Sequence, residues 1–171
     1  WKLYGKNPNN SQEFLASANW DNFTAGDDGL YINNIFPGID ASMKVMRGSI
    51  KTNFIVKSLQ FANYTELIFQ DELVFGNDVG VLQFMNISNS QQAADRVQLL
   101  ANNTSIVEIA EAIAYLENGN KAQRFSPEYS LKNNQLGIIM STVWLQQMLQ
   151  LGHVIIDPLV TSTNTLAQAA I

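Results

Sequence analysis

The spacing of hydrophobic residues changes along this chain, and that change restricts the folds available to it. Between residues 49 and 61 β-branched and aromatic residues are frequent, and the alternate positions Ile50, Thr52, Phe54 and Val56 fall on one face, with Ile55 making 54–56 apolar on both faces. Such alternation is typical of a β-strand with one buried face. A second strand is expected over 64–70, and residues 76–78 (Gly-Asn-Asp) favour a hairpin turn. The region 49–87 therefore predicts an antiparallel β-meander of three or four strands.

Helical spacing replaces this alternation on either side of the meander. Apolar residues recur at intervals of three and four over 90–101, 104–117 and 135–151, which predicts three helices. A capping pattern at 10–13 predicts a shorter helix that ends near residue 20, and Asp40 is placed to cap another over 41–47. The expected fold class is α+β, as a single domain over residues 1–171. Its central meander packs with helices that are mainly C-terminal.

The C-terminal region carries almost no charge. Apart from His153, Asp157 is the only acidic or basic residue between positions 133 and 171. The predicted helix 135–151 is apolar around most of its circumference, so it is buried on most sides in the monomer, shared with a neighbouring subunit, or in contact with a membrane surface. For a subunit contact, the residues expected at the interface are Leu136, Met140, Val143, Trp144, Met148 and Leu151. The uncharged segment 158–171 is a candidate arm of the kind that subunits exchange.

Composition argues against several classes of function. The net charge is −5 and the ten Lys and Arg residues are scattered, so no nucleic-acid partner is expected. The chain has no Cys and one His, His153, so we expect no zinc site, no cofactor and no covalent intermediate. No apolar run reaches 18 residues, so we expect no transmembrane helix.

Amides take the place of charges as the main polar groups. The chain has 19 Asn and 13 Gln, against 10 basic and 15 acidic residues. Asn-x-Ser/Thr patterns are more frequent than the roughly two that this composition gives by chance, although abundant Asn is itself a simple explanation. The candidate glycosylation sites are Asn9, Asn22, Asn63, Asn86, Asn102 and Asn103. We expect an extracellular or virion-associated protein.

These features favour three functions in descending order. The first is a non-enzymatic structural subunit that self-associates through its uncharged C-terminal region, as in a virion, a tail or a surface filament. The second is an extracellular module that binds a carbohydrate or another ligand through exposed aromatic and amide side chains. The third is a small hydrolase that uses a pair of carboxylates. The first function predicts a homo-oligomer or a larger protein assembly.

Overall fold

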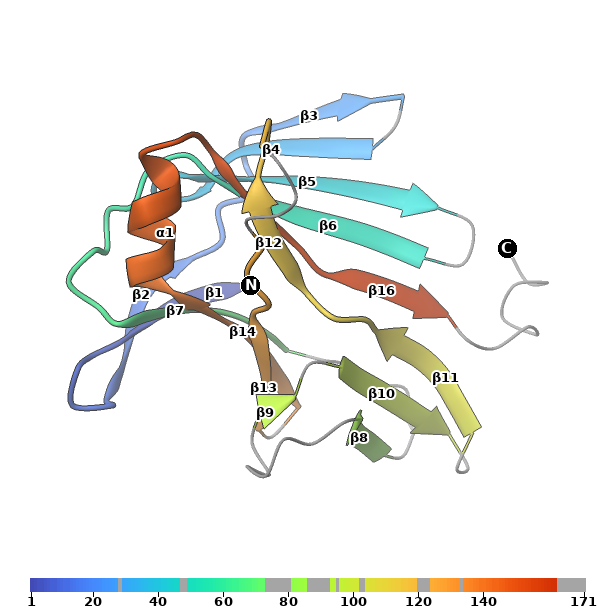
Figure 1. Cartoon of the computed structure of the whole chain (residues 1–171). Coiled ribbons are helices and arrows are strands. Elements are labelled where there is room, and N and C mark those ends of the chain that lie inside the picture. The colour runs from blue at the N-terminus through green and yellow to red at the C-terminus, as the bar shows by residue number, and fades with distance from the viewer. Residues whose placement is uncertain are drawn as a thin grey trace.

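The computed structural model describes residues 1–27, 29–46, 49–72, 81–85, 93–94, 96–101, 104–119, 124–132 and 134–162. Within these residues the chain forms two antiparallel β-sheets and one α-helix (Figure 1). Sheet A has six strands, in the spatial order β2 (Gln12–Ser17), β1 (Lys2–Lys6), β7 (Glu66–Glu72), β14 (Gln135–Ser141), β13 (Glu128–Lys132) and β9 (Ala93–Ala94).

Sheet B is larger and contains ten strands. Its main path runs through β3 (Phe23–Gly26), β4 (Gly29–Phe36), β5 (Ile39–Met46), β6 (Ser49–Val56), β16 (Leu159–Ser162), β11 (Thr104–Ile109), β10 (Arg96–Ala101) and β8 (Val81–Met85). Off this path, β15 (Val154–Asp157) pairs with both β6 and β12 (Ile113–Leu116). Figure 1 shows β3, β4, β5 and β6 following one another in a single layer, and each strand pairs antiparallel with the next.

The α+β prediction is wrong, because most of the predicted helices are strands. The segment 90–101 contains β9 and β10, and 104–117 contains β11 and β12. The short helices expected before residue 20 and over 41–47 are replaced by β2 and β5. In β12 every second side chain is buried, at Ala114 and Leu116, as in a strand. The apolar residues of 104–117 also fit the three- and four-residue spacing of a helix, which is why the sequence predicted one.

The predicted helix 135–151 divides into a strand and a helix. Leu136, Ile138 and Met140 alternate into the core from β14, and helix α1 (Thr142–Leu149) begins only after Ser141. The Ser141 Oγ accepts a hydrogen bond of 3.3 Å from the Trp144 N–H, which satisfies one of the free donors at the helix start. The helix then leads the chain from sheet A to β15 in sheet B.

The region 49–87 contains strands but no meander. Strands β6 and β7 are consecutive in sequence, yet β6 pairs within sheet B while β7 lies between β1 and β14 in sheet A. β8 pairs with β10. The turn expected at 76–78 lies outside the described residues.

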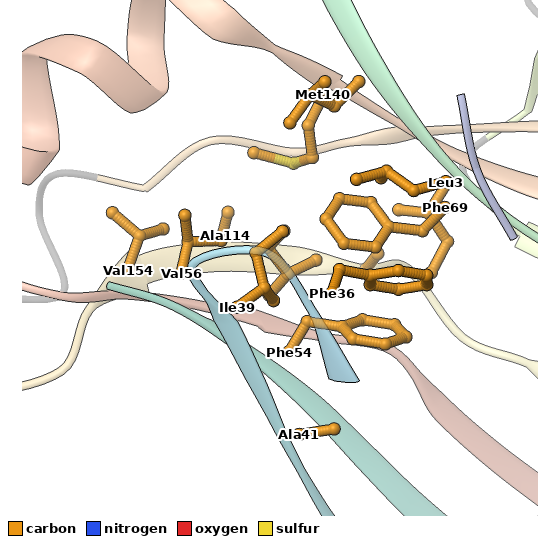
Figure 2. Packing of buried hydrophobic residues seen from close by; sticks show 14 of the residues in the cluster. Leu3, Phe36, Ile39, Ala41, Phe54, Val56, Phe69, Ala114, Met140 and Val154 are labelled. Atoms are coloured by element: carbon orange, nitrogen blue, oxygen red, sulfur yellow. The ribbon is translucent and has the colours of Figure 1, made fainter. Parts of the chain in front are cut away.

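Three phenylalanine rings join the two sheets. Phe69 of β7 lies 4.8 Å from Phe54 of β6 and 6.0 Å from Phe36 of β4, measured between ring centroids (Figure 2). All three side chains are fully buried, and Leu3 of β1 lies beside them. Rings at these separations and tilts interact favourably beyond their simple burial. This cluster is the centre of a core that receives side chains from both sheets.

Asp40 is a buried charged residue at the start of β5, and it stabilises an irregularity in β4. The pairing of β4 with β5 shifts register between Ile32 and Phe36, and Asn34 adopts a positive φ of 50° there. The Asp40 carboxylate accepts a hydrogen bond of 2.9 Å from the Asn34 N–H, and it also bonds with Tyr31 and Lys57. Burial alone would raise the pKa of Asp40, but these three partners outweigh it and hold that pKa below its usual value.

We expect Phe69→Ala to lower the free energy of unfolding by about 3–5 kcal/mol, because it opens a cavity between the sheets. The matched control is Phe14→Ala on β2, whose side chain is 56% exposed and should cost about 1 kcal/mol or less. Urea unfolding of the two variants tests this, and equal losses would contradict the central place of Phe69.

Asp40→Asn should cost about 1.5–3 kcal/mol at pH 7, since it removes hydrogen bonds to a charged group. The low pKa of Asp40 in the folded protein contributes stability above the unfolded pKa of about 3.9, and that contribution is lost as the pH falls through the folded value. The difference between wild type and Asp40→Asn should therefore shrink as the pH is lowered below about 4. Urea unfolding at a series of pH values measures it, and a difference that is constant with pH would refute the assignment.

Candidate functional site

The outer face of sheet A is hollowed into a groove of about 800 Å³. Side chains alternate along a strand, so the residues between the core positions of β1, β7, β13 and β14 point to this face. They form an apolar floor with a polar rim. The residues that the next paragraphs use are Tyr4, Lys6, Gln12, Glu66, Ile68, Gln70, Glu128, Ser130, Lys132, Gln135 and Ile139.

A chain of three amides crosses the groove. The Gln12 Nε2 donates a hydrogen bond of 3.4 Å to the Gln70 Oε1, and the Gln70 Nε2 donates one of 2.6 Å to the Gln135 Oε1. The three residues come from β2, β7 and β14, which are far apart in sequence. Each amide has two N–H groups and two lone pairs on its oxygen, so the chain keeps further donors and acceptors for a ligand.

An ion pair lies at the end of the groove near the β1–β2 turn. Lys6 and Glu66 face each other across β1 and β7, with the Lys6 Nζ 3.0 Å from the Glu66 Oε2. Glu13 stabilises the turn, because its carboxylate accepts hydrogen bonds of 2.7 Å from the Asn7 side chain and 2.8 Å from the Tyr64 hydroxyl. The bond to Glu13 raises the pKa of the Tyr64 hydroxyl. The position of Lys6 is thus set by the sheet and by this small network.

Two further charges line the opposite side of the groove, on β13. Glu128 and Lys132 lie four residues apart, so both side chains leave the strand on the groove face. Neither has an ion-pair partner among the residues that the structure describes. Both groups therefore remain available to a ligand.

Apolar side chains form the floor of the groove. Ile68 is 7% exposed and pairs in register with Ile139 of β14 and with Tyr4 of β1. A Cβ at Gly137 would lie 2.5 Å from the Ser130 Oγ and 2.9 Å from the Ile68 Cγ2. At the β2 side the floor continues into Tyr4 and Phe14, whose rings meet edge to face at 5.7 Å. The exposed Phe14 is available to stack on a ligand.

The predicted interface residues divide between the core and the surface. Leu136 and Met140 are buried among core residues of β14, and Trp144 and Met148 are half-buried against the core. Trp144 also lies 5.3 Å from the ring of Phe125. Val143 and Leu151 are exposed, at 60% and 63%. Of the predicted arm, residues 163–171 lie outside the described part of the chain.

The candidate glycosylation sites that the structure describes are all exposed. Asn9 lies in the β1–β2 turn, Asn22 directly precedes β3, and Asn63 lies shortly before β7. Asn86, Asn102 and Asn103 lie outside the described residues.

Other polar groups form structural contacts rather than a second site. His153 is exposed, and its Nδ1 lies 3.0 Å from the Glu117 Oε2. On the outer face of sheet B, the Lys51 Nζ lies 2.7 Å from the Asp157 Oδ2, and the hydrogen bond to Asp157 raises the pKa of Lys51. Across the described ranges, no three His, Asp or Glu side chains gather as metal ligands would. None of the helical residues described is part of a segment long and apolar enough to cross a membrane.

Sequence reasoning missed the groove because it assigned two of its strands to helices. Gln12 fell in a predicted helix, and Gln135 fell in the predicted helix 135–151. The alternation of Glu66, Ile68 and Gln70 with buried Leu67 and Phe69 was the available signal, since it marks one strand with a polar outer face.

No protein-family model matches the chain, and no curated protein or solved structure shows significant similarity to it. Its own geometry is therefore the basis for the functional proposal.

Proposed function

We propose that this chain is a ligand-binding module, and that the groove on sheet A binds a neutral oligosaccharide. The observation that carries the proposal is the amide chain Gln12–Gln70–Gln135 across an apolar floor. A sugar hydroxyl both donates and accepts hydrogen bonds, as an amide does, and the C–H face of a sugar ring packs on apolar and aromatic surface. Binding sites for small ligands commonly combine a mostly apolar floor with a few placed polar groups.

The amide chain also has a direction that favours binding. Gln70 donates to Gln135 and accepts from Gln12, so its position is held from both sides. Hydrogen bonds in series polarise one another, and amides that are already oriented lose less conformational freedom when a ligand binds. The Lys6–Glu66 pair, together with Glu128 and Lys132, adds charged donors and acceptors at the two sides.

Charge supports a neutral rather than an acidic ligand. Among the lining residues that the structure describes are two cations, Lys6 and Lys132, and two anions, Glu66 and Glu128, so the charges of this set cancel. The whole chain carries −5, which disfavours the approach of polyanions. The exposed sequon at Asn9, in the turn beside the groove, is consistent with an exported protein that meets glycans outside a cell.

Isothermal titration with neutral hexose, N-acetylhexosamine and uronate oligosaccharides tests the proposal. We expect saturable binding of a neutral oligosaccharide and weaker binding of uronates. Gln70→Ala should weaken that binding about tenfold or more, because it removes the centre of the amide chain. Its free energy of unfolding should change by about 1 kcal/mol or less, since Gln70 is a surface residue.

The matched control is Gln147→Ala on α1, an exposed residue that does not line the groove. It should bind as wild type does. Absence of binding across the whole panel, or equal affinity in both variants, would contradict the proposal. Release of shorter sugars from the same panel, lost in Glu66→Gln or Glu128→Gln, would replace binding by hydrolysis with these two carboxylates.

A second proposal is that the chain self-associates into a homo-oligomer. It is supported by apolar side chains that remain on the surface of the single chain, including Val143 and Leu151 in the C-terminal region. Light scattering and sedimentation over a dilution series should show a mass that falls toward the monomer as the protein is diluted. A monomer at every concentration would contradict self-association and leave the binding proposal unaffected.

A further inference from the structure

Apolar side chains form a single row across sheet A, at right angles to its strands. Phe14 of β2 pairs in register with Tyr4 of β1, and Tyr4 pairs with Ile68 of β7. Ile68 pairs with Ile139 of β14, and among the described residues the row ends at Glu128 of β13, which pairs with Ile139. Residues in register share a face of the sheet, so these side chains lie on the groove face. At a spacing of about 4.8 Å per strand, the row is about 19 Å long.

Polar side chains border this row on both sides. Two positions from it along the strands lie Gln12, Lys6 and Glu66 on one side, and Gln70 and Ser130 on the other. A pyranose sugar has a matching arrangement, with apolar C–H groups on its faces and hydroxyls around its edge. The row therefore suits sugar rings that lie flat on it, with their hydroxyls directed to the two polar borders.

The two ends of the row differ in chemistry. At one end the Phe14 side chain is 56% exposed, and the Tyr4 ring meets it edge to face at 5.7 Å. That contact orients the Phe14 ring while leaving much of it accessible, which lowers the conformational cost of stacking on a ligand. At the other end Glu128 is exposed, and the two oxygens of its carboxylate can accept hydrogen bonds from neighbouring hydroxyls of one sugar.

We propose that the groove takes an extended, β-1,4-linked glycan, which crosses the strands of sheet A along this row from Phe14 to Glu128. The inference rests on the proposed oligosaccharide binding and adds to it the linkage, the direction of the ligand and the stacking residue.

The geometry of the row selects the linkage. In β-1,4-linked glucose both bonds of each linkage are equatorial, so the chain is an extended ribbon whose sugars follow one another in a line. In α-1,4-linked glucose one of these bonds is axial, so the chain coils and successive sugars turn away from a common surface. Neighbouring strands are rotated by about 20–25°, and an extended glycan follows this twist by small rotations at each linkage.

Isothermal titration of the full chain tests the linkage. It compares β-1,4-linked oligosaccharides of glucose and of N-acetylglucosamine with α-1,4-linked oligosaccharides of glucose, each from the disaccharide to the pentasaccharide. We expect at least one β-1,4 series to bind about tenfold more tightly than the α-1,4 series at equal length. Within that series the affinity should rise with length until the ligand spans the row, and then level off.

Substitution of Phe14 tests the stacking residue. Phe14→Ala should weaken binding of the tightest β-1,4 pentasaccharide about tenfold or more, and Phe14→Trp should retain it, because a second aromatic ring restores the platform. The matched control is Phe23→Ala on β3 of sheet B, which removes a similarly exposed ring outside the groove and should bind as wild type does. Both phenylalanines are exposed, so the variants should keep the wild-type circular dichroism.

Glu128→Ala tests the direction of the ligand. Phe14 and Glu128 lie at opposite ends of the row, on β2 and β13. A glycan that ran along the strands would reach one of them but not both. We therefore expect Glu128→Ala to weaken pentasaccharide binding as Phe14→Ala does, and a loss in only one of the two variants would overturn the direction.

The outcomes separate this inference from the proposed function. Equal or tighter binding of the α-1,4 series overturns the linkage, and unchanged affinity in Phe14→Ala overturns the stacking residue. If none of the three series binds but another neutral oligosaccharide does, and Gln70→Ala weakens it, the groove remains a sugar site and only this inference fails. Loss of binding in Phe23→Ala would place the ligand on sheet B and overturn both. Absence of binding by every neutral oligosaccharide would also overturn both.

Discussion

The contact of Phe69 with Phe36 and Phe54 is the constraint on which the rest of the structure depends. It is where sheet A meets sheet B, and all three rings are removed from solvent. Because side chains alternate along each strand, fixing Phe69 in the core also fixes Ile68 and Gln70 on the opposite face of β7. A slip of one residue in β7 would place Gln70 between the sheets and Phe69 in the groove. The internal packing therefore sets the register of the groove face outside.

The groove and the core lie on opposite faces of the same strands. The groove is therefore built from segments that are far apart in sequence, as sheet A itself is. β1, β7 and β14 lie next to one another in sheet A, and each contributes inward apolar and outward polar residues. Leu3, Phe69 and Ile138 face the core, while Tyr4, Gln70 and Gln135 face the groove. The outward residues contribute little to stability, so they can vary in chemistry while the core stays the same. The three glutamines of the groove lie on this outward face, where they present uncharged donors and acceptors.

The sequence predicts secondary structure correctly where the spacing of apolar residues fits a strand alone. It fails where that spacing fits both a strand and a helix. Ile50, Thr52, Phe54 and Val56 occupy alternate positions, a spacing that indicates a strand, and β6 lies there. At Ile109, Ile113 and Leu116 the apolar residues fit a helix equally well, and pairing with β15 and β16 decides for strands. Which strands pair with each other depends on the whole fold. The sequences of β6 and β7 do not by themselves indicate that the two strands belong to different sheets. Correct strands alone would not have predicted the groove, since Gln12, Gln70 and Gln135 meet only once the sheet order is known.

The strand order of sheet A has a consequence for how the chain reaches its native state. β3, β4, β5 and β6 pair with their neighbours in sequence, so they form by closing short turns. In sheet A, Leu3 pairs with Phe69 and Phe69 with Ile138, contacts that require long loops to close. A chain with so many non-local pairings folds slowly, on the millisecond to second scale of all-β proteins. The pairing of β3–β6 does not by itself cover Phe36 and Phe54, and apolar surface that is uncovered during folding favours aggregation. The docking of Phe69 on these two rings therefore removes an aggregation-prone surface, and because Gln70 is the next residue of β7, the same step places Gln70 on the face that carries the groove.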